Sequence, residues 1–242
     1  MGTALGWGSL SASSLVLGAL LALARRWPQR VVGLVLAFGA GALISAVSFE
    51  LAEEAVRLGD RGVAAAGLAI GALVYYLLDG VIGDVGSGGH GRAARASGSN
   101  AGTALALGAF LDGIPEQMVL GIGLAAGAGV SVALLVAIFV SNRPEAIGSA
   151  SDMRDAGRDD RTIVRLWIAV ATVCALATIV GFAVADAVSD NLKAGIDGFA
   201  AGALLVMLVD SMIPDATHRS GRTAGLVTTL GFAVAAGLSF TS

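Results

Sequence analysis

The residues best suited to chemistry are carboxylates placed inside two long apolar stretches. Asp112 and Glu116 are four residues apart in Asp-Gly-Ile-Pro-Glu-Gln, so on a helix they share one face. Ser141 and Glu145 have the same spacing in Ser-Asn-Arg-Pro-Glu, with Asn142 three residues before the glutamate. A charged group inside a membrane span costs about 2.5 to 3.5 kcal/mol on insertion scales, so each is a candidate for function.

Each of these elements has a proline directly before its glutamate. Pro115 and Pro144 each remove one backbone hydrogen bond and free a carbonyl in the preceding turn. Oxygen ligands suit Mg²⁺, Mn²⁺ and Ca²⁺, whereas imidazole and thiolate favour Zn²⁺ and its neighbours. The elements therefore predict an oxygen-only cation site on two kinked helices. The predicted ligands are Asp112, Glu116, Ser141, Asn142 and Glu145.

Arg143 lies within the second element and leaves two interpretations open. The three carboxylates and this guanidinium carry a net charge of −2, which one divalent cation would neutralise. The side chain projects about 100° or more around the helix from both neighbouring ligands. It could therefore pair with an acid on another helix and take the place of the cation. The first interpretation predicts metal binding, and the second predicts an internal lock without metal.

Eight apolar stretches carry these residues and predict membrane spans. The 242-residue chain is 56% hydrophobic and 14% charged, with a mean hydropathy of +0.82, more apolar surface than a soluble fold of this size can bury. Crossing a bilayer takes about 20 apolar residues per helix. The predicted spans are about 5–24, 31–52, 62–83, 101–125, 130–151, 163–184, 196–217 and 222–240. We predict an all-α polytopic membrane protein with one transmembrane domain, residues 1–242.

The distribution of basic residues predicts the orientation of these spans. Eleven arginines fall in the loops on one side and three basic residues on the other. Cytoplasmic loops carry the excess of Lys and Arg, so both termini are predicted to lie outside a cell (inner) membrane. The first span has no basic region before it, so we expect it to be retained rather than cleaved as a signal peptide. The Gly-, Ser- and Ala-rich segment at about 84–100 is predicted to be a flexible cytoplasmic loop.

An internal repeat relates the second and seventh predicted spans. The motif Phe-Gly-Ala-Gly-Ala-Leu at 38–43 matches 199–204 at five of six positions, an offset of 161 residues. The two spans run in opposite directions, which predicts an inverted repeat of helices 1–3 and 6–8 around helices 4 and 5. Inverted repeats are typical of transporters, with the binding site between the halves. Coincidence between two Gly/Ala-rich helices is the alternative.

Other classes of protein fit the sequence less well. The net charge of −3 and the lack of a basic stripe argue against a nucleic-acid partner. Neither His90 nor His218 falls within a predicted span, so a serine protease would lack its base, and the motifs of paired-aspartate proteases are missing. Cys174, the single cysteine, is predicted to be a packing residue. We therefore predict no enzyme and no cofactor.

The two Pro-Glu elements resemble those of the ZIP family of divalent metal transporters. That family carries His-Asn-x-Pro-Glu-Gly in its fourth helix and His-Asp/Glu-x-Pro-Glu-Gly in its fifth. The Ile-Pro-Asp-Ala segment at 213–216 is similar to Ile-Pro-Glu-Ala-His of the family's seventh helix, and Arg154-Asp-Ala-Gly is similar to a segment after its fifth. The resemblance covers most of the chain and implies eight spans with both termini outside.

The chain departs from the family pattern where that family has its nitrogen ligands. Asp112 and Gly113 stand in place of His and Asn, and Ser141 and Asn142 stand in place of a ligating His or Gln and a carboxylate. In the sixth helix, Cys174 falls where the family's Glu-Pro acid is expected. We therefore expect at most one bound cation, and a preference for harder metals than in members that have His.

The leading hypothesis is a transporter that moves Zn²⁺, Mn²⁺, Fe²⁺ or a similar cation toward the cytoplasm. The resemblance implies that helices 1, 4, 5 and 6 slide as a body against helices 2, 3, 7 and 8. The alternative is a ZIP-fold membrane protein that has lost metal transport or carries a small organic solute, with Arg143 neutralising the site. A homodimer in the lipid bilayer is compatible with either.

Acidic residues near the span ends leave further alternatives open. Those at the outer end of the second span could attract cations or form a solvated acidic loop. They are Glu50, Glu53, Glu54 and Asp60. Asp210, Asp215 and His218 at the inner side could line an exit path or mark an interfacial helix end. Asp197 is predicted to cap the start of the seventh helix.

Overall fold

The described part of the chain is helical, with no strand, which confirms the predicted all-α class. The computed structural model describes residues 1–86, 101–125, 132–185, 187 and 189–240. The α-helices are α1 (Gly2–Ala24), α2 (Gln29–Ala46), α3 (Glu53–Leu58), α4 (Arg61–Gly86), α6 (Ala101–Ala125), α7 (Val132–Asp155), α8 (Asp160–Val184), α9 (Asp190–Met207), α10 (Ile213–Ser220) and α11 (Thr223–Ser239). Residues 84–86 of the predicted loop belong to α4, and residues 87–100 lie outside the described residues.

Five helical segments among the described residues are long and apolar enough to cross a membrane. They are Gly2–Ala24, Gln29–Leu58, Arg61–Gly80, Asp160–Val184 and Asp190–Ser220. Helix α11 is apolar but has 17 residues, while α6 and α7 occupy the predicted fourth and fifth spans with 25 and 24 residues. The described helices agree with a multi-pass membrane protein, and the total of eight spans stays a prediction.

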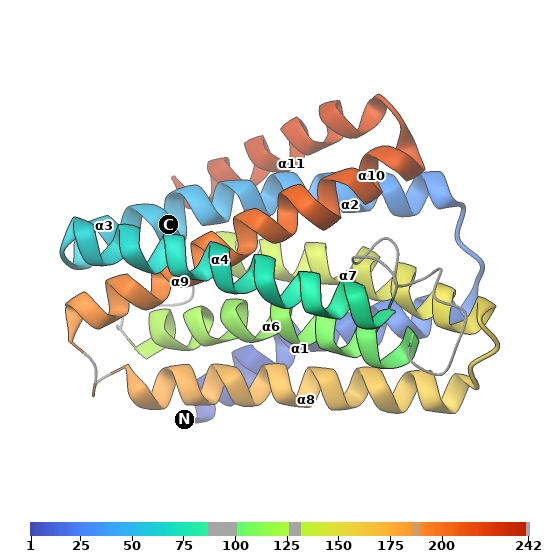
Figure 1. Ribbon diagram of the computed structural model, residues 1–242, viewed down its shortest axis with the longest axis horizontal. Helices are drawn as coiled ribbons and strands as arrows, with labels where there is room; N and C mark the ends of the chain where they lie inside the picture. Colours follow the sequence, from blue (N-terminus) through green and yellow to red (C-terminus); the bar gives the residue numbers. More distant parts are fainter. Residues whose placement is uncertain (87–100, 126–131, 186, 188, 241–242) are drawn as a thin grey trace.

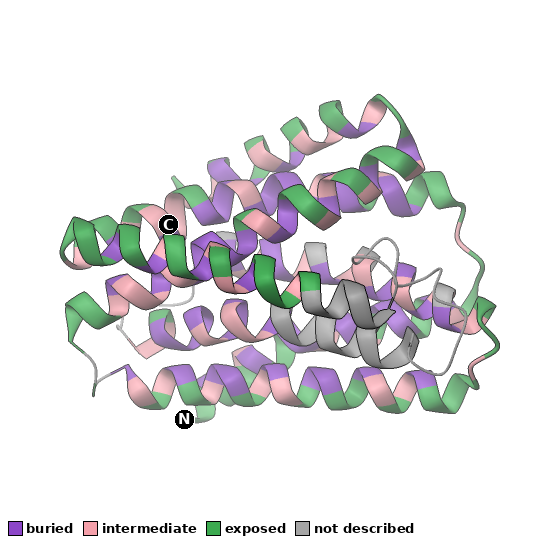
Figure 2. Ribbon diagram, in the orientation of Figure 1, coloured by how far each residue is buried: buried purple, intermediate pink, exposed green. Residues whose placement is uncertain are grey.

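The helices form two packed groups (Figure 1). In one group α1 contacts α7 and α8, and α8 also contacts α6. In the other group α2 contacts α10 and α11, while α9 contacts α3 and α4. Contact between α2 and α7 joins the groups. Figure 2 shows exposed residues along the outward turns of α8 and α11, and these include large apolar side chains such as Leu226, which is 76% exposed. Exposed leucines suit a surface that faces lipid tails.

Two of the long helical segments contain a short π-helical stretch at related positions. Helix α2 continues through η1 (Val47–Ala52) into α3, and α9 continues through η2 (Leu208–Met212) into α10. The two stretches begin at Val47 and Leu208, which are 161 residues apart. This is the offset of the sequence repeat. A π-helical turn inserts an extra residue and is frequent at functional sites. The same local irregularity thus recurs in both copies of the repeated motif.

Glycines allow these helices to approach their neighbours closely. A Cβ added to Gly41 on α2 would overlap the carbonyl oxygen of Thr228 on α11. A Cβ added to Gly202 on α9 would overlap the carbonyl oxygen of Leu68 on α4. The two glycines are 161 residues apart, so equivalent positions make equivalent contacts. Small residues at such crossings favour close packing of membrane helices.

The turn between α7 and α8 explains the segment Arg154-Asp-Ala-Gly. Gly157 has a φ of +82°, a left-handed conformation that residues with a Cβ rarely adopt, and its N–H donates to the Arg154 carbonyl at 3.0 Å. Asp159 then caps α8 by accepting a hydrogen bond from the backbone N–H of Arg161 at 3.1 Å. The segment therefore reverses the chain between two long helices.

The prediction that Asp197 caps its helix is wrong. Helix α9 begins at Asp190, and the Ser189 hydroxyl accepts the capping hydrogen bond from the N–H of Leu192 at 3.3 Å. Asp197 lies about two turns inside the helix and is 4% exposed. Helix α9 therefore starts before the apolar stretch that predicted it. Its first turn is polar and lies near the end of the bundle, so it is not part of that apolar stretch.

Candidate metal site

Helices α6 and α7 hold the predicted cation ligands near their midpoints. Glu116 is three residues from the centre of Ala101–Ala125, and Asn142 and Glu145 flank the centre of Val132–Asp155. Glu116 is 2% exposed, Asn142 is 4% exposed and Glu145 is partly buried. The side chains of Asp112 and Ser141 lie outside the described residues. Three of the predicted ligands are therefore described, and all three are at least partly buried.

The described residues contain no cluster of three or more His, Cys, Asp or Glu side chains suited to a metal. Of the predicted carboxylate ligands, the structure describes the side chains of Glu116 and Glu145 but not that of Asp112. The five-residue ligand set thus stays a prediction. Burying the Glu116 carboxylate away from water is costly, which is the physical reason to expect a function for it.

Gln117, the neighbour of Glu116, joins three helices through buried hydrogen bonds. Its Nε2 donates to the Ser11 hydroxyl on α1 at 2.8 Å, and its Oε1 accepts from the Thr178 hydroxyl on α8 at 2.7 Å. All three side chains are fully buried. The network connects α1, α6 and α8 directly beside Glu116, and therefore holds this part of α6 in a defined orientation. In the sequence, the signal for this network is the polar residue Gln117 directly after Glu116. Gln117 was not among the predicted cation ligands.

Substitution of Gln117 by Leu tests this network. The change keeps the volume but leaves the Ser11 and Thr178 hydroxyls without their partner, so we expect a stability loss of about 1 to 2 kcal/mol, near the upper range for hydrogen bonds between membrane helices. Thermal unfolding of the purified protein in detergent measures the change. Thr172→Val is the matched control, because the described hydrogen bond of the Thr172 hydroxyl lies within its own helix, to the Ile168 carbonyl. Equal melting temperatures for the two variants would contradict a joining role for Gln117.

Cys174 lies directly against Gly113. A Cβ on Gly113 would be 2.5 Å from the Cys174 Sγ, and Cys174 is fully buried. These are the two positions at which the resemblance leads us to expect an Asn and an acid. Their contact supports the register that places Cys174 in α8 opposite α6. A glycine and a thiol occupy this space, and neither supplies the oxygen ligands of a second metal position.

Arg143 packs on an aromatic ring in the structure. Its Cζ lies 4.1 Å from the centre of the Phe139 ring, one turn earlier on α7. None of the ion pairs described for the structure includes Arg143, and its buried Nε has no hydrogen-bond partner among the described residues. A cation over an aromatic face gains about 0.5 to 2 kcal/mol. The described contacts therefore show a guanidinium packed on Phe139, and a lock with Asp112 stays an alternative, because that side chain lies outside the described residues.

The outer acidic residues take part in local contacts. Glu54 forms an ion pair with Arg57 at 2.6 Å. The Asp60 carboxylate accepts hydrogen bonds from the N–H groups of Gly62 and Val63, at the start of α4. These contacts fit the solvated acidic loop at least as well as a surface that attracts cations.

The inner acidic group is dispersed. Asp215 pairs with Arg219 on its own helix at 2.9 Å, while Asp210 and His218 are exposed. The ion pair and the exposed side chains fit an interfacial helix end about as well as an exit path.

Comparison with known proteins identifies the family of the chain. Residues 84–239 match the model of the ZIP zinc transporter family, a stretch that contains α6, α7 and both Pro-Glu elements. No curated protein matches the chain at a significant level. The matched region covers more than half of the 242 residues. The chain, with its apolar helices and buried polar residues on α6 and α7, therefore belongs to the ZIP zinc transporter family.

Proposed function

We propose that this protein carries one divalent cation at a time toward the cytoplasm through a mid-membrane site on α6 and α7. The observation that carries the proposal is the burial of Glu116 and Asn142 near the midpoints of two contacting, proline-containing helices. Membership in a zinc and divalent metal transporter family supplies the class of substrate. The cation is the transported substrate and not a resident cofactor.

The proposed ligands supply only oxygen atoms. They are Asp112, Glu116, Ser141, Asn142 and Glu145. Carboxylate, amide and hydroxyl groups bind Mn²⁺, Mg²⁺ and Ca²⁺ without the imidazole or thiolate that strengthens Zn²⁺ binding. The contact of Gly113 with Cys174 leaves the neighbouring position without an acid. We therefore propose a single cation site with a weaker preference for Zn²⁺ than in relatives that have His ligands.

The proposed transport cycle uses an inverted repeat of helices α1, α2 and α4 with α8, α9 and α11. The π-helical stretches and the contacts of Gly41 and Gly202 recur at the 161-residue offset, which supports the repeat. Helices α1, α6, α7 and α8 form one packed group, and we propose that it slides against the other group. Alternating access in inverted-repeat transporters is largely such a rigid-body motion.

The proposed orientation of the bundle in the membrane rests on its basic residues. The ends of α1, α7 and α10 carry a concentration of arginines, including Arg26, Arg154 and Arg219, and such an excess is typical of the cytoplasmic side. We propose that these ends face the cytoplasm of the cell (inner) membrane and that both termini lie outside.

Metal uptake by reconstituted vesicles tests the proposed function. Purified protein in liposomes is expected to accumulate at least one of Zn²⁺, Mn²⁺, Mg²⁺ and Ca²⁺ above empty vesicles, with a titration stoichiometry of one cation per chain. Fluorescent indicators inside the vesicles follow uptake, and calorimetry gives the stoichiometry. If no member of this panel enters faster than in protein-free vesicles, the transport proposal is wrong. Tight binding of two Zn²⁺ ions per chain would refute the single oxygen-only site.

Arg143→Ala separates transport from the alternative of a ZIP-fold protein without metal transport. Because Arg143 packs on Phe139, we expect the variant to keep or strengthen cation binding and to lose no more than about 2 kcal/mol of stability. A buried lock would instead leave carboxylates unpaired and cost about 3 to 5 kcal/mol. Calorimetric titration and melting temperatures of the wild type and the variant distinguish these outcomes.

A further inference from the structure

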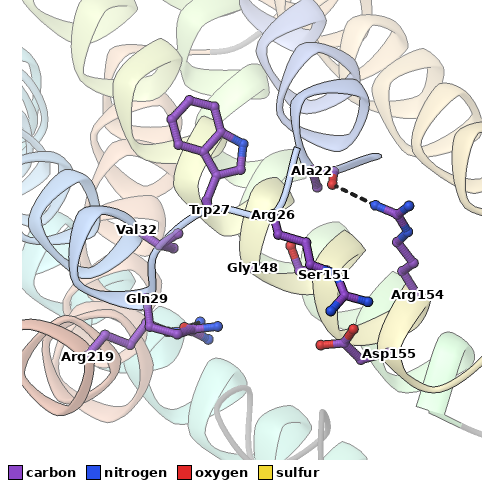
Figure 3. A pocket seen from close by; sticks show the side chains of 10 residues that line it. All are labelled: Ala22, Arg26, Trp27, Gln29, Val32, Gly148, Ser151, Arg154, Asp155 and Arg219. Atoms are coloured by element: carbon purple, nitrogen blue, oxygen red, sulfur yellow. Dashed lines mark hydrogen bonds between the residues drawn. The ribbon is translucent and has the colours of Figure 1, made fainter. Parts of the chain in front are cut away.

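A small polar cavity opens where the basic ends of several helices meet. Its volume is about 150 Å³, and α1, α2, α7, α10 and the α1–α2 connection all contribute to its wall. The polar side chains that line it are those of Arg26, Gln29, Ser151, Arg154, Asp155 and Arg219 (Figure 3). Three guanidinium groups and one carboxylate line the cavity, and the Asp215 carboxylate that pairs with Arg219 lowers their combined charge from +2 to +1. The cavity lies at the helix ends, apart from the midpoint residues of the proposed cation site.

Two of these arginines are held in place by neighbouring groups. The Nη1 of Arg154 donates to the carbonyl oxygen of Ala22 at 3.5 Å (Figure 3) and to that of Leu23 at 3.1 Å, at the C-terminal end of α1. The described hydrogen bonds of Arg154 use this atom alone, whereas a guanidinium carries five N–H donors. Arg219 donates to Asp215 on α10 and to Gln29 on α2. Both guanidinium groups are therefore oriented before any ligand binds.

Arg26 completes the basic wall from the connection between α1 and α2. The residue is exposed, and its side chain runs toward Asp155 across the cavity (Figure 3). None of the described ion pairs includes Arg26. Its guanidinium can therefore turn toward an anion without breaking a described ion pair.

We propose that this cavity binds one phosphate group of a molecule whose net charge is negative. Arginine forks match phosphate oxygens bidentately, and charge-assisted hydrogen bonds of this kind are strong. Basic pockets between membrane helices at the cytoplasmic side also suit anionic lipid headgroups. The phosphate has two potential sources, an anionic lipid of the adjacent leaflet or a free phosphate in solution. A phosphate group from either source offers the same charged oxygens to the arginines. A binding experiment with three probes separates the two sources.

A bound phosphate would connect the two helix groups. Arg154 belongs to α7, which packs with α1, whereas Arg219 belongs to α10, which packs with α2. Arg219 already approaches α7, since its Nη2 lies 3.6 Å from the position of a Cβ on Gly148. An anion held by both arginines bridges the groups at one end. Binding itself is independent of metal transport and is measured without it.

Binding to the purified protein in detergent tests the proposal with three probes. They are dioctanoyl phosphatidylglycerol, dioctanoyl phosphatidylcholine and inorganic phosphate, and thermophoresis gives each Kd. We expect phosphatidylglycerol, inorganic phosphate or both to bind more tightly than zwitterionic phosphatidylcholine. Binding of phosphatidylglycerol alone assigns a lipid source, and binding of inorganic phosphate assigns a soluble one. If neither anion binds better than phosphatidylcholine, the proposal is wrong.

Arg26→Gln and Arg30→Gln provide the matched comparison. Both arginines are exposed and lose the same charge, but only Arg26 lines the cavity. We expect Arg26→Gln to weaken anion binding about tenfold, as the loss of one charge-assisted contact predicts, and Arg30→Gln to change it little. Unchanged melting temperatures confirm that both variants fold. Equal Kd values for the two variants would show general attraction to a basic surface and overturn the assignment to this cavity.

Discussion

Glu116→Gln is expected to lower metal uptake about a hundredfold while the protein still folds. The substitution keeps the size and one side-chain oxygen but removes the charge of a carboxylate that is 2% exposed near the midpoint of α6. A dehydrated divalent cation loses its strongest kind of oxygen ligand, and a loss of about 3 kcal/mol in a charged contact corresponds to that factor. Uptake of the best-transported cation by reconstituted vesicles measures the effect. Glu145→Gln is expected to give a loss of the same order.

Asp160→Asn is the matched control for these variants. It also replaces a carboxylate by an amide, but Asp160 is exposed in the first turn of α8. We expect uptake by this variant to stay within about twofold of the wild type, because an exposed surface charge changes stability by less than about 0.5 kcal/mol. Normal uptake by both Glu116→Gln and Glu145→Gln would place the cation site elsewhere in the protein.

Gly41→Ala and Gly202→Ala are expected to be among the most destabilising single-methyl changes at the described glycines of the helix bundle. In each case the added Cβ overlaps a carbonyl oxygen of the neighbouring helix, Thr228 on α11 or Leu68 on α4. Helices must separate to admit it, and such overpacking costs about 1 to 3 kcal/mol. Melting temperatures in detergent measure the loss. Because the two glycines occupy repeat-related positions, we expect their losses to be similar.

Gly225→Ala shows what the same change does where there is space. Gly225 is exposed in α11, and a Cβ there meets no atom within 4 Å. Alanine favours a helix over glycine by about 1 kcal/mol, so this variant is expected to be as stable as the wild type or slightly more stable. If Gly41→Ala melts at the same temperature as Gly225→Ala, then α2 and α11 do not pack as closely as the structure describes.

The sequence predicted helix positions well because membrane spans follow a local rule. A run of about 20 apolar residues satisfies its backbone internally as a helix wherever it lies in the fold. The predicted stretches at 5–24, 62–83 and 163–184 accordingly fall within α1, α4 and α8. The start of α9 was missed because a polar first turn, capped by Ser189, carries no apolar signal.

Family membership also followed from local information. The Pro-Glu pairs are short and contiguous, so they can be identified without coordinates, and the family match covers both of them. The 161-residue offset was likewise visible in the sequence, and the π-helical stretches at Val47 and Leu208 recur at that offset. The set of metal ligands remains a prediction, since the Asp112 and Ser141 side chains lie outside the described residues.

The sequence by itself determined the class of the protein: the apolar helices, the family and the placement of polar groups within two apolar stretches. The tertiary structure decided which distant residues meet. Gln117 joins Ser11 and Thr178, 106 and 61 residues away in sequence, and Arg143 packs on Phe139 and not on a described acid. The physical reason is that hydropathy and motifs act within one helix, whereas the partners of a buried polar side chain depend on how helices rotate and cross in three dimensions.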